Sequence, residues 1–220
     1  MKAFILAAGE GRRMLPLTAA TPKPLFVVRG KTLIEWHLEG LVRAGITQVV
    51  INLHHLGDQI RAYLGNGAAF GVDIAYSEES SLLETGGGIR QALPLLDPTQ
   101  QGAPFVVING DVFTDFDFSQ LSSNLGNWQA RLVMVHNPPH HPEGDYGVGG
   151  DGSLQLHGPR WTYSGIGVYS SRLFRGSRQG SLMLREMFVP AIQAGRLAGQ
   201  VYEGRWVDVG TPARFAALNL

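Results

Sequence analysis

Short apolar runs alternate with helical patterns through the first half of the chain, and this alternation restricts the possible folds strongly. Four apolar runs predict buried strands, at residues 3–8, 48–53, 72–76 and 105–109. Helical spacing of apolar residues predicts helices between and after them, at 32–44, 56–64 and 88–95. Strands and helices in this order favour right-handed crossovers and a parallel sheet that is covered on both faces.

The second half of the chain is more antiparallel in character, because Gly- and Pro-rich turns separate its apolar segments. Strands are expected at residues 131–135, 148–156, 163–169 and 200–209. Two more helices are expected, at 181–194 with a kink or break at Pro190, and at 212–218. We see no linker or repeat, and we expect one α/β domain over residues 1–220, with a mostly parallel sheet and a more antiparallel C-terminal half.

The composition excludes several kinds of protein. Lys plus Arg and Asp plus Glu both number 18, so no overall field favours nucleic acid or a membrane surface. The lack of cysteine excludes disulfides, zinc–thiolate sites and thiol nucleophiles. No apolar run approaches the roughly 20 residues of a membrane helix, and the apolar start is too short for a signal peptide. We therefore expect a cytoplasmic protein that binds neither nucleic acid nor membrane.

The loop after the first strand, GEGRRM at residues 9–14, has the composition of a phosphate site. Its glycines let the backbone approach an anion, and Arg12 and Arg13 add bidentate donors. Prolines on both sides of Lys23 hold this lysine on a stiff segment. A surface loop with solvated charges accounts for the same residues equally well. The loop is neither a P-loop nor a dinucleotide fingerprint, since Met14 stands where the fingerprint needs glycine.

Two aspartates are candidate ligands of a hard cation. The apolar run at 105–109 leads into Gly110 and Asp111, and ligands of parallel sheets bind outside such strand ends. Asp111 therefore lies on the same sheet edge as the glycine–arginine loop, and it fits a Mg²⁺ ligand or a turn residue equally well. Asp208 lies in the segment WVDVGTP, whose Thr-Pro pair predicts the start of a helix.

Two of these segments carry a family resemblance. The run LAAGEGRRMLPLTAATPKPL resembles the signature of the sugar-phosphate nucleotidyltransferases, LAAGxGxRxxPxTxxxPKPL. The segment WVDVGTP is similar to the late motif W-x-D-x-G-T-P of that family. The resemblance implies a Rossmann-like, GT-A-like nucleotidyltransferase fold. It also implies a reaction between a nucleoside triphosphate and a sugar 1-phosphate.

The resemblance also implies roles for individual residues. Arg13 would face the β- and γ-phosphates, and Lys23 would bridge the α-phosphate and the sugar phosphate. Asp111 and Asp208 would hold Mg²⁺, and these four residues form the implied catalytic set. The other implied nucleotide contacts are Ala8, Gly9, Gly11, Arg12, Glu79, Thr85, Gly86 and Asn109. Arg12 departs from the pattern, because many relatives carry a small or polar residue there.

The segment LETGGG at residues 83–88 bears on the nucleobase. Three glycines before a helix would bring backbone N–H groups close to a ligand. The string and the lone catalytic domain resemble short bacterial members that take UTP and N-acetylmuramate 1-phosphate in peptidoglycan recycling. Members that transfer guanylyl groups to mannose- or heptose-1-phosphate carry a similar string, so the base stays open. A non-catalytic nucleotide-sugar sensor is a third alternative, which the implied catalytic set disfavours.

The acceptor sugar is less well defined by the sequence. The resemblance implies sugar contacts at Asp145, Gly147, Ser164 and Gly165, which are equally well explained as turn residues. The lactyl carboxylate of a muramate would need a cation or backbone donors. The pairs His54-His55 and His140-His141 are expected to be solvated loop residues, because adjacent side chains rarely chelate one metal together. The implied reaction is a direct in-line displacement that needs no general base, since the sugar phosphate is already an anion.

Overall fold

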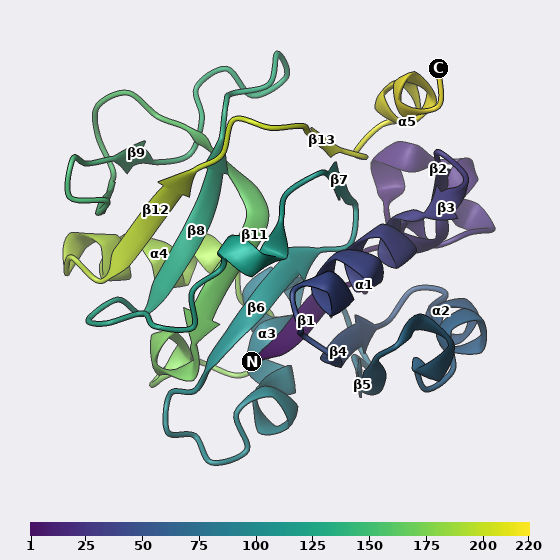
Figure 1. Cartoon of the computed structure of the whole chain (residues 1–220), viewed down its shortest axis with the longest axis horizontal. Helices are drawn as coiled ribbons and strands as arrows, with labels where there is room; N and C mark the ends of the chain where they lie inside the picture. The colour runs from purple at the N-terminus through teal and green to yellow at the C-terminus, as the bar shows by residue number, and fades with distance from the viewer.

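A computed structural model describes all 220 residues and has an α/β architecture around one seven-stranded sheet (Figure 1). The strands lie in the order β12 (Leu197–Val201), β8 (Ala130–Val135), β11 (Thr162–Ser170), β6 (Pro104–Asn109), β1 (Lys2–Leu6), β4 (Gln48–Leu53) and β5 (Asp73–Glu78). Only β11 runs antiparallel to its neighbours in this sheet. The mostly parallel sheet is confirmed, and its antiparallel part is the pairing of β11 with β6 and β8.

Five helices complete the fold: α1 (Leu33–Arg43), α2 (Gly57–Leu64), α3 (Glu84–Leu96), α4 (Leu184–Gln193) and α5 (Pro212–Leu218). Alternate strand residues face opposite sides of the sheet. Ala3 and Ile5 of β1 pack in the core with α1 and α2, whereas Phe4 packs in the core with α3 and α4. The continuous apolar strands in the sequence arise because the sheet is buried on both faces.

Helix α1 begins where the sequence provides a capping box. Thr32 accepts a hydrogen bond from the backbone N–H of Glu35, and the Glu35 carboxylate accepts one from the backbone N–H of Thr32. The helix then packs against the short ribbon of β2 (Val27–Val28) and β3 (Lys31–Thr32), where Trp36 Nε1 donates to the Val28 carbonyl. This packing holds the segment after Lys23 against the rest of the domain.

Two predicted strands are wrong in extent. The segment 148–156 forms a hairpin of β9 (Gly147–Val148) and β10 (Leu154–Gln155), in which the Gly149 N–H donates to the Ser153 carbonyl. The segment 200–209 divides into β12 and β13 (Trp206–Asp208), and β13 pairs with β7 (Val112–Thr114) outside the main sheet. Both divisions depend on hydrogen bonds between distant residues, which local apolar patterns do not encode.

Two helix predictions are also corrected. Helix α3 begins at Glu84 rather than at residue 88, so its three glycines lie inside the first turns and not before the helix. A Cβ on Gly87 would lie 2.3 Å from the Gly180 carbonyl oxygen, which shows that close packing requires glycine there. Helix α4 continues through Pro190, so the break allowed by the sequence does not occur, whereas the alternative of a kink stays a prediction.

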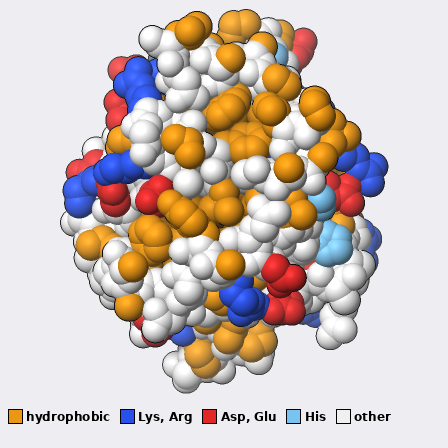
Figure 2. Space-filling view, turned by 90° about the vertical axis from the view of Figure 1, so that its right-hand side faces the viewer, with side chains coloured by type: hydrophobic (Ala, Val, Ile, Leu, Met, Phe, Trp, Pro, Cys, Tyr) orange, Lys and Arg blue, Asp and Glu red, His pale blue; other side chains and the backbone are white.

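The face that carries α5, β2 and α2 has hydrophobic side chains across its centre, with Lys and Arg scattered among acidic residues (Figure 2). Leu15, Leu17 and Val27 are among the exposed hydrophobic residues of the chain. None of the five helices combines the length and the hydrophobicity needed to span a bilayer.

Candidate active site

Two adjoining cavities lie outside the carboxyl ends of β1, β4 and β6. The first, of about 240 Å³, is lined by residues that include Ala8, Gly9, Glu79 and Thr85. The second, of about 380 Å³, is lined by residues that include Asp145 and Asp208. Asn109 and Asp111 line both cavities, so the end of β6 forms the boundary between them. The expectation that the 9–13 loop and Gly110-Asp111 meet at one sheet edge is confirmed.

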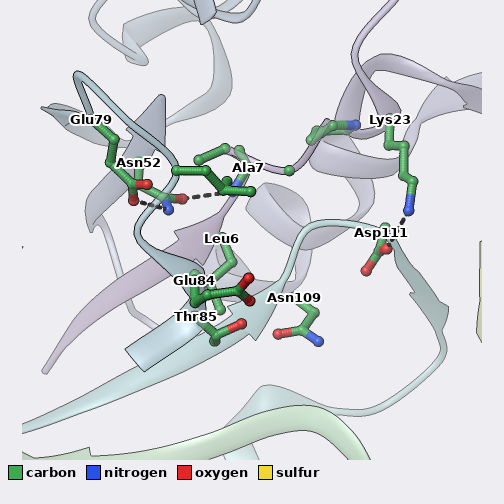
Figure 3. A pocket seen from close by; sticks show the side chains of 13 residues that line it. Leu6, Ala7, Lys23, Asn52, Glu79, Glu84, Thr85, Asn109 and Asp111 are labelled. Carbon is green, nitrogen blue, oxygen red and sulfur yellow. Dashed lines mark hydrogen bonds and ion pairs between the residues drawn. The ribbon is translucent and has the colours of Figure 1, made fainter. Parts of the chain in front are cut away.

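A buried polar network forms the inner wall of the first cavity (Figure 3). Asn52, at the end of β4, accepts a hydrogen bond from the Ala7 N–H at 2.7 Å and donates to Glu79 Oε1 at 2.7 Å. Burial raises the pKa of the Glu79 carboxyl above its usual value, and the hydrogen bonds from Asn52 and the Leu83 N–H oppose that rise. We call these residues the Asn52–Glu79 network.

The glycines of α3 make room for this network. A Cβ on Gly88 would lie 2.5 Å from Glu79 Oε1 and 2.9 Å from Asn52 Nδ2. Gly86 is buried, and its Cβ would lie 2.7 Å from the Leu182 carbonyl oxygen. The Gly87 N–H is also hydrogen-bonded, because it donates to that carbonyl at 3.1 Å. In this structure the glycine run serves close packing, while Glu84 and Thr85 face the cavity.

Lys23 and Asp111 form an ion pair at the boundary between the cavities. Lys23 Nζ lies 2.9 Å from Asp111 Oδ2, as Figure 3 shows, and the lysine side chain is only 12% exposed. Gly110 lets the chain turn between β6 and Asp111, because a Cβ there would lie 2.6 Å from the Leu6 carbonyl oxygen. The sequence segments at residues 23 and 111 are thus joined directly by an ion pair.

A two-stranded ribbon places Asp208 beside Asp111. Strand β13 pairs with β7 so that Asp208 stands opposite Val112, and the Val209 N–H donates to the Asp111 carbonyl at 2.7 Å. Arg214 Nη2 donates to Asp208 Oδ2 at 2.7 Å, which fixes one carboxylate oxygen. The other oxygen, Oδ1, is buried without a hydrogen bond, although His140 Nε2 lies 3.0 Å away.

The two aspartates have the chemistry of a hard-cation site. Their carboxylates line one cavity, and the buried Asp208 Oδ1 has unused acceptor capacity. No group of three or more His, Asp or Glu side chains in the chain has the geometry to hold a metal ion by itself. A Mg²⁺ ion held by Asp111 and Asp208 would therefore complete its coordination with phosphate oxygens and water, as Mg²⁺ commonly does.

The glycine–arginine loop is partly turned away from the cavities. Gly11 adopts φ of 65°, and a Cβ there would lie 2.9 Å from Lys23 Cε, so the glycine permits close approach of the lysine stem. Arg13 lines the second cavity. Arg12 is directed to solvent, with its side chain 82% exposed and paired with Glu10. Of the two arginines, only Arg13 lines one of the two cavities.

The other site residues predicted from the sequence also fall into two groups, those that line a cavity and those that do not. Ala8, Gly9, Lys23, Glu79, Thr85 and Asn109 line the first cavity, and Asp145 and Ser164 line the second. Gly147 is packed beneath the His157 carbonyl. Gly165, with φ of 81°, packs against the Asn109 side chain at the irregular point of β11. Gly11, Arg12, Gly86, Gly147 and Gly165 line neither cavity, and any role that they have in binding stays a prediction.

Sequence reasoning missed several residues. Asn52 ends a buried strand, and that position alone could have marked it. The view that the histidines are merely solvated is wrong. His140 lies beside Asp208, and His141 Nε2 lies 3.2 Å from Asp145 Oδ1. His54 contacts the Glu79 carbonyl at 2.9 Å, and His55 the Thr18 carbonyl at 3.0 Å.

This geometry agrees with the comparisons with known proteins. Residues 2–152 match the family described as nucleotidyl transferase. The chain belongs to this family, and the resemblance to sugar-phosphate nucleotidyltransferases is confirmed.

Among curated relatives, an N-acetylmuramate alpha-1-phosphate uridylyltransferase from Neisseria meningitidis is 49% identical over 97% of this chain and 95% of its own length. A protein of the same name from Caulobacter vibrioides is 30% identical over 98% of this chain and 94% of its own length. A mannose-1-phosphate guanyltransferase from Gibberella zeae is 29% identical over 98% of this chain, which spans 62% of that protein.

Solved structures support the same fold. A Bacillus anthracis protein, provisionally described as a glucose-1-phosphate thymidylyltransferase and crystallised with sucrose, has a TM-score of 0.80 at 26% identity. The match covers 100% of this chain and 94% of that one. HddC from Yersinia pseudotuberculosis, solved with GMP-PN, has a TM-score of 0.81 at 20% identity and covers 99% of this chain and 97% of its own. The GT-A-like nucleotidyltransferase fold is thereby confirmed.

Proposed function

We propose that this enzyme transfers a uridylyl group from UTP to N-acetylmuramate α-1-phosphate and releases pyrophosphate. The observation that carries the reaction type is the grouping of Lys23, Asp111 and Asp208 where the two cavities meet. The 49% identity to a protein of that specificity, over nearly the full length of both chains, supports the choice of substrates. UTP is a cytoplasmic nucleotide, and we propose a cytoplasmic location on that ground.

In this proposal the nucleotide occupies the first cavity and the sugar phosphate the second. Backbone groups of Ala8 and Gly9 and the Asn52–Glu79 network face the uridine. Arg13 faces the β- and γ-phosphates, and Lys23 lies between the α-phosphate and the sugar phosphate. Both side chains suit this role, because guanidinium and ammonium groups form charge-assisted hydrogen bonds with phosphate oxygens.

The reaction is a single displacement. An oxygen of the sugar phosphate forms a bond to the α-phosphorus of UTP, and the bond from that phosphorus to the bridging oxygen of pyrophosphate breaks. The attacking oxygen is already anionic, so no side chain has to remove a proton. The chain contributes positioning and charge neutralisation, with Lys23 at the reacting phosphates and Arg13 at the leaving group.

Mg²⁺ is the proposed cofactor, with Asp111 and Asp208 as its protein ligands. When bound, it would neutralise phosphate charge and help align the reactants. Arg214 contributes by holding Oδ2 of Asp208, so that Oδ1, which makes no hydrogen bond and lies 3.0 Å from His140 Nε2, is the oxygen proposed to bind the cation.

Guanylyl transfer to mannose 1-phosphate is the alternative, because relatives of that name match the chain at 29% identity. The enzyme should be incubated with UTP, GTP, CTP or dTTP against N-acetylmuramate, N-acetylglucosamine, mannose and heptose 1-phosphates. Pyrophosphate release with UTP and N-acetylmuramate 1-phosphate as the best pair supports the proposal. A preference for GTP and mannose 1-phosphate contradicts it. Absence of release with every pair would favour a sensor.

A further inference from the structure

The loop between β8 and β9 forms one wall of the second cavity and is firmly built. Asn137 Nδ2 donates to the Pro142 and Arg160 carbonyls, each at 3.0 Å. Its Oδ1 accepts a hydrogen bond from Thr162 Oγ1 at 2.9 Å. Gly144, with φ of 61°, packs directly on the Asn137 side chain. A loop that is tied at these points can present a side chain in one place, as a specificity site requires.

Asp145 lines the second cavity, and its carboxylate also contacts this loop and β11. Its Oδ2 accepts a hydrogen bond from the Tyr163 N–H at 2.8 Å, and its Oδ1 lies 3.2 Å from His141 Nε2. Each carboxylate oxygen therefore already has a partner within the chain. This arrangement makes Asp145 a positioning residue for His141, in addition to the sugar contact expected from the sequence.

The proposed acceptor carries a lactyl carboxylate as well as its phosphate, and the carboxylate needs a counter-charge. The second cavity is lined by three aspartates, which would repel it. The side chains around that cavity that can carry positive charge are Arg13, His140 and His141. Arg13 serves the triphosphate in the proposed reaction, and His140 lies against Asp208. His141 remains, and its Nδ1 makes no hydrogen bond within the chain.

We propose that His141, oriented by Asp145, binds the lactyl carboxylate and thereby selects N-acetylmuramate 1-phosphate over sugar phosphates without that group. The inference rests on the proposed function, because it concerns the acceptor of that reaction. In the proposed complex both ring nitrogens donate, Nε2 to Asp145 and Nδ1 to the ligand. The imidazole ring then lies between two carboxylates, one from the protein and one from the substrate.

The test compares two acceptors that differ only in the lactyl group. Initial rates with UTP are measured for N-acetylmuramate and N-acetylglucosamine 1-phosphates, using wild type, His141→Gln, Asp145→Asn and the control His157→Gln. His157 is exposed and lines neither cavity. For His141→Gln, KM for N-acetylmuramate 1-phosphate should rise about 10- to 100-fold, the size expected for a lost charge-assisted hydrogen bond. The KM of the same variant for N-acetylglucosamine 1-phosphate should change by less than about twofold.

The remaining outcomes are equally definite. Asp145→Asn should shift the acceptor preference in the same direction by a smaller factor, and His157→Gln should leave it unchanged. An equal loss with both acceptors, or an unchanged KM, would overturn the role of His141. If His141→Gln does not fold, wild type is tested with the methyl ester of the lactyl group, whose KM should rise by a similar factor. Wild type that is inactive with UTP and N-acetylmuramate 1-phosphate would instead refute the proposed function.

Discussion

The two cavities of the active site are built in different ways. The first is made by the ends of parallel strands and the start of α3, and its polar groups are buried and hydrogen-bonded to one another. The second is made by β11, the ribbon of β13 and a loop, and its polar groups are half-exposed ion pairs. The first cavity, the proposed nucleotide side, is therefore fixed by sheet register. The second cavity, the proposed acceptor side, is fixed by exchangeable side-chain pairs.

The largest expected effect on kcat comes from changing the two aspartates between the cavities, Asp111 and Asp208. Asp208→Asn and Asp111→Asn should each lower kcat by about 10²- to 10³-fold or more, because charge stabilisation of the reacting phosphates is lost. Pyrophosphate release measures the loss, and thermal unfolding checks that the fold is kept. Asp58→Asn, at an exposed position of α2, is the matched control. Near-wild-type turnover in both boundary variants would refute the mechanism.

Lys23→Met should have the next largest effect, with kcat reduced by about 10²-fold. The methionine keeps most of the buried stem and removes the charge beside Asp111. Stopped assays at saturating UTP and sugar phosphate separate this loss from weaker binding. If KM for UTP rose while kcat stayed the same, Lys23 would belong to ground-state binding on the nucleotide side alone.

Gly87→Ala tests whether backbone packing fixes the nucleotide side. The new Cβ would collide with the Gly180 carbonyl, so we expect a loss of about 1–3 kcal/mol in the free energy of unfolding. KM for UTP should rise severalfold, and KM for the acceptor should stay within about twofold. Urea denaturation and initial rates measure these quantities. Gly150→Ala, where a Cβ meets open space, is the control, and an equal effect of both changes would contradict the interpretation.

Glu79→Gln should produce the smallest effect, visible in the pH dependence of stability. Burial raises the pKa of Glu79 in the folded chain, so the fold binds this proton more tightly than the unfolded chain does. Stability from this group is present at low pH and is lost as pH rises from about 4.5 through the folded pKa. The stability of the glutamine variant relative to wild type should therefore increase over that range in urea denaturation. If the difference in unfolding free energy between the two proteins did not change with pH, the hydrogen bonds to Glu79 would fully offset the effect of burial on its pKa.

The sequence predicted the nucleotide side better than the acceptor side. Strand β4 has the predicted bounds, and Gly9 and Asp111 meet at one sheet edge as predicted from the parallel topology. The acceptor side depends on contacts between distant residues, such as Asp145 with Tyr163 and His140 with Asp208. Local patterns could not reveal these contacts, nor the division of the 200–209 segment.

The glycine run of α3 has a packing role that its motif did not indicate. Glycines before a helix commonly leave backbone N–H groups free for a ligand. Here the helix starts earlier, and the Gly87 N–H is already bonded to the Leu182 carbonyl. The glycines matter because the segment around Leu182 crosses them closely, and the sequence alone does not show which segment crosses a helix.

The ribbon of β7 and β13 also bears on how such an enzyme can change. Because Asp208 is placed opposite Val112 by strand pairing, the spacing of the two carboxylates does not depend on the length of chain between them. That intervening chain contains β8, β11 and β12 of the main sheet, joined by the loop of His141 and the hairpin of β9 and β10. The loop and the hairpin can be lengthened, shortened or exchanged, in evolution or in design, provided that the sheet strands and the ribbon keep the same register.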